Sequence, residues 1–106
     1  MNTRDYIELA KANSKIQSDY ALAQRLGITR QSISKFQSGN YVMSDEIAVK
    51  VAALAGKSPA FVLADIHAER EKDPAIRAIW MGMLDKLAVG FNSLLQPAKI
   101  GTMLKI

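Results

Sequence analysis

The sequence of 106 residues has no cysteine and only one histidine, His67. Without cysteine, the chain has no disulfide, no thiolate metal ligand and no cysteine nucleophile. No second ligand lies at metal-binding spacing from His67, so we expect this side chain on a helix surface or partly buried. No glycine-rich loop suited to cradling phosphate is present either. We therefore expect no metal and no cofactor, and an enzyme is the least favoured class of function.

Long hydrophobic runs are also missing. The most apolar stretch, residues 75–95, contains Arg77, Asp85 and Lys86, which argue against a membrane span. The first ten residues carry three charged side chains and lack the apolar run of a secretory signal. We expect a cytoplasmic protein that does not enter the membrane.

What is present is the composition of an ordinary globular domain, with 49% hydrophobic and 23% charged residues. The length fits one small domain. Fourteen basic residues against ten acidic ones give a net charge of +4, which permits a polyanionic partner without requiring one.

The few glycines and prolines divide the chain into segments of helical length, and strand-like alternation is nearly absent. We expect helices over about residues 3–14, 19–26 and 29–37, from Ser44 to Ala55, from Ser58 through Ile66, and over roughly 20 residues after Pro74. Residues 69–73 are expected to form a solvated hinge, and residues 96–106 an irregular tail. The predicted fold class is all-α.

Residues 18–40 have the pattern of a helix-turn-helix. Ser18 and Thr29 are suited to begin two short helices, and Gly27 lies where a bend is needed. Ala23 is small enough for a close approach of the two helices. Five apolar side chains are expected to face inward: Leu22, Leu26, Ile28, Ile33 and Phe36.

The opposite face of the second helix is polar. Its side chains can bond to base edges or phosphates in a DNA major groove: Arg30, Gln31, Ser34 and Lys35. Residues 11–40 hold five basic side chains and one acidic one, and 5 − 1 = +4 equals the net charge of the whole chain. Such clustering favours contact with phosphates.

This segment resembles the Cro/cI-type (XRE) helix-turn-helix family of phage and bacterial repressors, and the likeness extends over roughly residues 4–66. The resemblance implies a five-helix Cro/cI repressor-like DNA-binding domain whose third helix, beginning at Thr29, enters the major groove. It assigns base reading to Arg30, Gln31 and Ser34, a flanking contact to Lys35, and phosphate contacts to the loop of Ser38, Gly39 and Asn40.

One position departs from the family pattern. Many members carry glutamine at the first residue of the second helix, whereas this chain has Asp19. An acid facing DNA would repel phosphate. We therefore expect Asp19 to cap its helix or to pair with Arg30 or Arg25.

The helix after Pro74 has an apolar face that is too wide to remain exposed to solvent. We divide the chain into a DNA-binding domain, 1–72, and an amphipathic dimerisation helix with its tail, 73–106. The expected dimer interface comprises Ile76, Ile79, Trp80, Met83, Leu87 and Phe91. The alternative is that this helix docks back onto its own domain.

The sequence thus predicts a transcriptional regulator of phage or mobile-element type, a repressor that binds double-stranded DNA as a homodimer on a pseudo-palindromic operator. Two alternatives stay open. One is an antitoxin that binds its own promoter and also binds a toxin through the last helix. The other is an interaction or membrane-associated adapter that binds no DNA.

Overall fold

The computed structural model describes residues 1–94, with side chains described as far as residue 87. The expected irregular tail and the side chain of Phe91 lie outside these limits. The described residues form six helices and no strand, which confirms the all-α class. The helices are α1 (Thr3–Ser14), α2 (Asp19–Leu26), α3 (Arg30–Ser38), α4 (Asp45–Ala55), α5 (Pro59–Arg70) and α6 (Pro74–Leu94).

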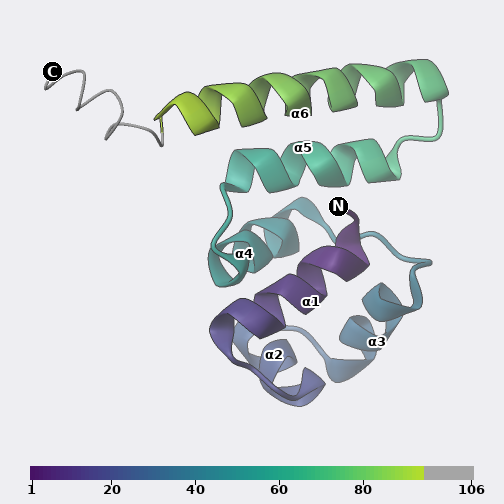
Figure 1. Cartoon of the computed structure of the whole chain (residues 1–106). Coiled ribbons are helices and arrows are strands. Elements are labelled where there is room, and N and C mark those ends of the chain that lie inside the picture. The colour runs from purple at the N-terminus through teal and green to yellow at the C-terminus, as the bar shows by residue number, and fades with distance from the viewer. Residues whose placement is uncertain (95–106) are drawn as a thin grey trace, which may run out of the picture.

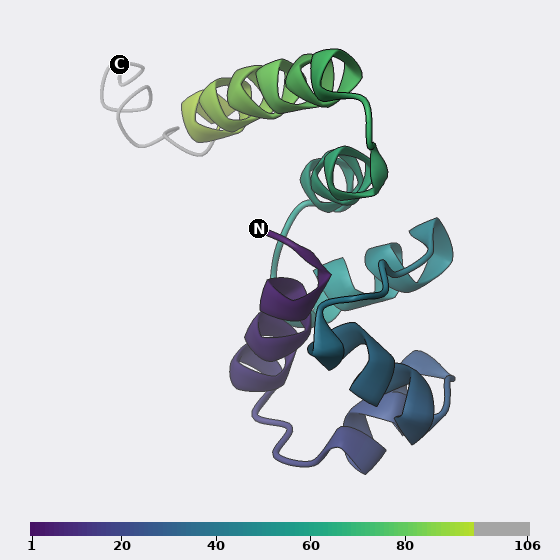
Figure 2. The same ribbon diagram turned by 90° about the vertical axis from the view of Figure 1, so that its right-hand side faces the viewer.

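The helices stack in an order that leaves α2 and α3 at one end of the molecule and α6 at the other (Figure 1). Helices α1 and α4 lie between these ends, and α5 separates them from α6. A view from the side shows the same order, with α6 beyond α5 and away from α2 and α3 (Figure 2). None of the helices in residues 1–94 has both the length and the apolar character to cross a bilayer.

Local capping explains why most helices begin where they do. The side chains of Ser18, Thr29 and Ser44 each accept a hydrogen bond from the backbone amide three residues later, which confirms these predicted caps. Ser58 is different, because its side chain makes no capping bond. Pro59 begins α5 instead, since its fixed φ suits the first helical position.

The core contains most of the side chains that the sequence pattern placed inside. Leu22, Leu26 and Ile33 are fully buried, and Ile28 and Phe36 are partly buried against the same cluster. The other members of this cluster come mainly from α1, α4 and α5: Tyr6, Ile7, Ala10, Ala23, Met43, Ile47, Ala48, Val51, Ala52, Ala55, Val62 and Ile66. The inward face predicted for the helix-turn-helix is therefore confirmed.

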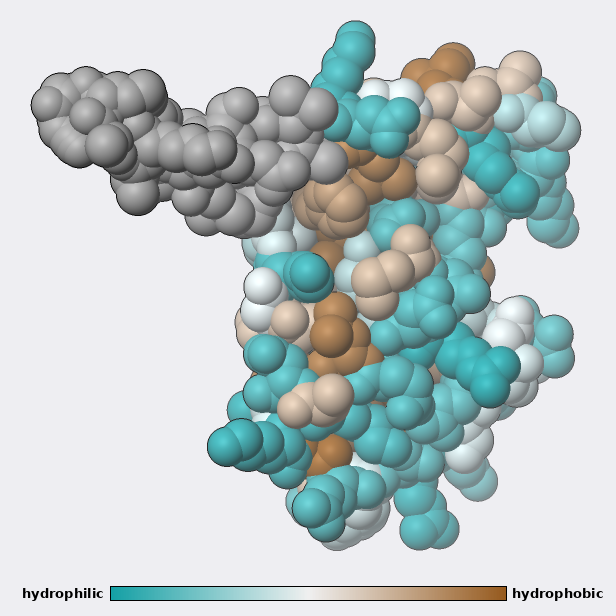
Figure 3. Space-filling model, in the orientation of Figure 1, coloured by the Kyte–Doolittle hydropathy of each residue, from teal (hydrophilic) through white to brown (hydrophobic). Residues whose placement is uncertain are grey.

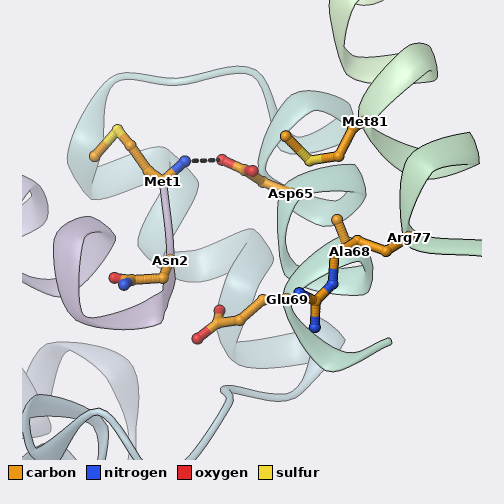
Figure 4. A pocket seen from close by; sticks show the side chains of 7 residues that line it. All are labelled: Met1, Asn2, Asp65, Ala68, Glu69, Arg77 and Met81. Atoms are coloured by element: carbon orange, nitrogen blue, oxygen red, sulfur yellow. Dashed lines mark hydrogen bonds and ion pairs between the residues drawn. The ribbon is translucent and has the colours of Figure 1, made fainter. Parts of the chain in front are cut away.

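Polar bonds join the start of α1 to α5. The Tyr6 hydroxyl donates to Asp65 Oδ2 at 2.6 Å, and the amino group of Met1 lies 2.8 Å from the same oxygen. Burial of Tyr6 and its bond to Asp65 raise the pKa of the phenol, so it stays a donor. Figure 4 shows Met1 and Asp65 on the wall of a hollow of about 350 Å³ that also borders α6.

The predicted hinge is shorter than the charged run from which it was inferred. Glu69 lies within α5 and accepts bonds from both the amide and the hydroxyl of Thr3, each at 2.8 Å. Arg70 also lies within α5 and donates to Asp45 Oδ1 at 2.9 Å. Because tertiary contacts hold these two side chains, only residues 71–73 link α5 to α6.

One side of α6 packs along α5. Leu84 is buried there, with 6% of its surface exposed. The Trp80 ring stacks on His67 with centroids 4.9 Å apart and planes inclined by 30°. Arg77 donates through Nε and Nη2 to the carbonyl of Glu71, which fixes the start of α6. This side of α6 therefore docks onto the chain's own domain, which was the alternative to dimerisation.

Candidate nucleic-acid interface

The turn between α2 and α3 depends on Gly27. Its φ of +72° lies in the left-handed region, where a side chain is strained. The amide of Ile28 donates back to the carbonyl of Ala23 at 3.0 Å, and Lys50 of α4 donates to the carbonyl of Leu26 at 3.3 Å. These bonds satisfy the last carbonyls of α2 and set the direction in which α3 leaves the turn.

Helix α3 has one buried side and one exposed side. Ile33 is its only fully buried residue, and Thr29 caps its first turn by accepting from the amide of Ser32. All of the predicted base-reading and flanking residues are exposed: Arg30, Gln31, Ser34 and Lys35. Helical spacing puts Gln31 and Lys35 on the face opposite Ile33, with Ser34 beside them and Arg30 in the first turn. The structure thus gathers these four side chains on one surface.

Ser38 was predicted to lie in the loop after α3, but it is the last residue of that helix and shapes the turn that follows. The Ser38 hydroxyl donates to the carbonyl of Lys35 at 2.6 Å and accepts from the amide of Asn40 at 3.2 Å. It therefore shapes the turn, in which Gly39 has a φ of +85°. Gly39 and Asn40 are exposed beside it. The three residues do lie together at the end of α3, as predicted.

Two tyrosines next to α3 were not singled out by the sequence pattern. Tyr20 is 59% exposed, and it borders a hollow of about 430 Å³ that Gln24, Arg30 and Gln31 also line. Tyr41 is 51% exposed, and the ammonium of Lys35 lies 5.3 Å from the centre of its ring. The available signal in the sequence was their position beside the predicted DNA-binding segment, because tyrosine hydroxyls bond to phosphates.

Asp19 makes no hydrogen bond or ion pair with either arginine, contrary to the prediction, although the charge of Arg30 contributes to the lowering of its pKa. Asp19 is the first residue of α2, but Ser18 makes the capping bond. Asp19 Oδ1 instead accepts from Lys11 Nζ at 2.8 Å and from Gln37 Nε2 at 3.2 Å. The bond from Lys11 lowers the pKa of Asp19 below its ordinary value. The fold, in which α1 packs against α3 and α4, brings Lys11 to Asp19, and sequence spacing did not reveal this.

This pairing changes how the basic excess is distributed. Lys11 and Asp19 compensate each other, whereas Lys15, Arg25, Arg30 and Lys35 are exposed and make no ion pair within the described residues. Figure 3 shows that the end of the molecule formed by α2 and α3 is mainly hydrophilic. Among the described residues, Arg30 and Lys35 therefore leave positive charge without an ion-pair partner on the exposed side of α3, which favours contact with phosphate.

The predicted dimer residues separate into two sets on α6. Ile76, Ile79, Met83 and Leu87 are 37–63% exposed. Trp80 is half-buried in its contact with His67, so it belongs to the side that packs on α5. Hydrophobic surface is visible on α6 in Figure 3.

Comparisons with known proteins add no assignment: no protein-family model, curated protein or solved structure matches the chain.

Proposed function

We propose that this chain is a sequence-specific DNA-binding transcriptional regulator of the Cro/cI type, a repressor that acts as a homodimer on a pseudo-palindromic operator. The observation that carries the proposal is the exposed face of α3. Gln31 and Lys35 project there on the side opposite the buried Ile33, with exposed Ser34 beside them and Arg30 in the first turn. Side chains of this kind on a short helix after a glycine turn are suited to a major groove.

The surroundings of α3 support the same reading. Arg25 on α2 and Lys15 before it are exposed and carry positive charge. The first helix of a helix-turn-helix, here α2, crosses the DNA backbone, so a charge such as that of Arg25 would contact phosphate. Tyr20 and the loop at Gly39 and Asn40 border the same surface and would add further backbone contacts.

The exposed side of α6 supports a dimer. Ile76, Ile79, Met83 and Leu87 form an apolar stripe that stays exposed to solvent. Pairing of two such stripes across a two-fold axis would hide both and tether two copies of α3. Tethering raises affinity through effective concentration without any new contact to DNA.

The test is selection of binding sites from random double-stranded DNA, followed by titration of the selected site and a scrambled site at several salt concentrations. We expect a selected sequence with two related halves about one helical turn apart, or a multiple of it. The logarithm of the binding constant should fall linearly with the logarithm of the salt concentration. Lys72→Ala is the matched control for α3 variants, since Lys72 is exposed in the link between α5 and α6.

The apolar stripe of α6 also favours a second candidate, a partner-binding protein such as an antitoxin or an adapter. An antitoxin would select a DNA site as well and would bind its toxin through α6. An adapter would select no sequence and would show no salt-dependent affinity for DNA. If the selection yields no DNA site and α6 binds another protein, the adapter function would replace the proposed regulator function.

A further inference from the structure

We infer that Gln37 is a positioning residue that sets the orientation of α3 through a polar network with Glu8, Lys11 and Asp19, and that recognition of DNA depends on it. The inference rests on the proposed function for its consequence in DNA binding, but the geometry of the network is independent of that function. Its members come from α1, α2 and α3.

Helix α3 needs such a support because its apolar anchoring is slight. Ile33 is its only buried residue, and Phe36 is partly buried. These two contacts hold the helix against the core, and the turn at Gly27 sets its start. Bonds with fixed direction at the other end would limit the movement of its last turn.

Gln37 makes those bonds. Its Nε2 group donates to Asp19 Oδ1 of α2 at 3.2 Å and to Glu8 Oε2 of α1 at 3.1 Å. Lys11 Nζ donates to the same Asp19 oxygen at 2.8 Å. Gln37 is half-buried, and so are Lys11 and Asp19, which limits their competition with water. One amide therefore ties the last turn of α3 to both neighbouring helices.

The residue types fit this role. Two carboxylates converge on one amide nitrogen, which has two hydrogens to donate. A carboxylate at position 37 would face two like charges, and an apolar side chain would leave both acceptors without this donor. Lys11 compensates the charge of Asp19, so the acid stays near the proposed DNA surface with little repulsion of phosphate. This arrangement gives Asp19 a role that its sequence position did not indicate.

The experiment compares the wild-type chain with Gln37→Met and Gln37→Glu. Gln17→Met is the matched control, because Gln17 is exposed and makes no side-chain hydrogen bond within the described residues. The first measurement needs no DNA. Residual dipolar couplings of backbone amides give the orientation of α3 relative to α1 and α4. The second measurement is the ratio of affinities for the selected and scrambled DNA sites.

For Gln37→Met we expect changed couplings in α3 with unchanged couplings in α1 and α4, and a loss of roughly tenfold in the affinity ratio, as for one bond to a charged group. Gln37→Glu should lose more, and Gln17→Met should match the wild type. Unchanged α3 couplings in a folded Gln37→Met variant would overturn the inference. If the wild-type chain selects no DNA sequence, the proposed function fails, while the couplings still decide the role of Gln37.

Discussion

At the scale of single residues, two glycines occupy opposite kinds of backbone position. Gly27 has a φ of +72°, whereas Gly82 lies within α6, where an added Cβ would meet nothing within 4 Å. Gly27→Ala should therefore lower the free energy of unfolding by about 1 kcal/mol or more, because left-handed backbone strains a residue with a Cβ. Gly82→Ala should raise it by about 0.5–1 kcal/mol, since glycine weakens a helix interior. Urea unfolding of both variants tests this, and equal effects would contradict it.

Arg30 and Lys35 should differ in what they contribute to DNA binding. We expect Arg30→Ala to cost about 1–3 kcal/mol on the selected site and to relax the preference at one base pair. Lys35→Ala should weaken binding to all sequences alike and reduce the salt slope by about 1. Titrations on selected and scrambled DNA measure both effects, with Lys72→Ala as control. Equal losses on the two DNAs for Arg30→Ala would count against base reading.

Between elements, the bond from Lys11 to Asp19 joins α1 to α2 and should make stability depend on pH. It raises the pKa of Lys11 above 10.5 and lowers that of Asp19 below 3.8. The depressed carboxyl pKa contributes stability above pH 3.8 that is lost as the pH falls through the lower value. The raised ammonium pKa contributes stability below pH 10.5 that is lost as the pH rises through the higher value.

The pH prediction can be checked with Asp19→Asn. The difference in unfolding free energy between this variant and the wild type should be constant from about pH 5 to pH 9 and should shrink at both extremes. Chemical unfolding at a series of pH values measures this difference. A gap that persists unchanged well below pH 3 would mean that the ion pair contributes little.

Local signals explain which elements were predicted well. The caps at Ser18 and Thr29 and the turn at Gly27 depend on bonds and dihedral angles within a few residues, so the sequence alone indicated them. The partners of Asp19 depend on how α1 docks on α3 and α4, which no spacing encodes. The same holds for Trp80, because the apolar stripe of α6 is wide and only packing on α5 shows which side is covered.

At the scale of the whole molecule, the exposed stripe of α6 should hold the dimer together. Ile79 is 63% exposed, so Ile79→Asn should disturb the fold little while adding polar groups to the interface. We expect this variant to sediment as a monomer and to bind the selected DNA more weakly than the wild type. Met81→Asn is the matched control, because Met81 is 47% exposed but borders the hollow near Met1. An Ile79→Asn variant that stays dimeric would assign the stripe to another partner.

The placement of α6 and α3 at opposite ends has a mechanical consequence (Figure 1). In a dimer joined through α6, each copy of α3 would lie far from the α6 pair, so a rotation of one protomer at that pair would displace α3. A small change in the crossing angle between the two α6 helices would therefore produce a larger displacement of the two α3 helices. Substitutions on α6 would therefore retune the spacing between half-sites while the preference for bases within each half-site stayed the same.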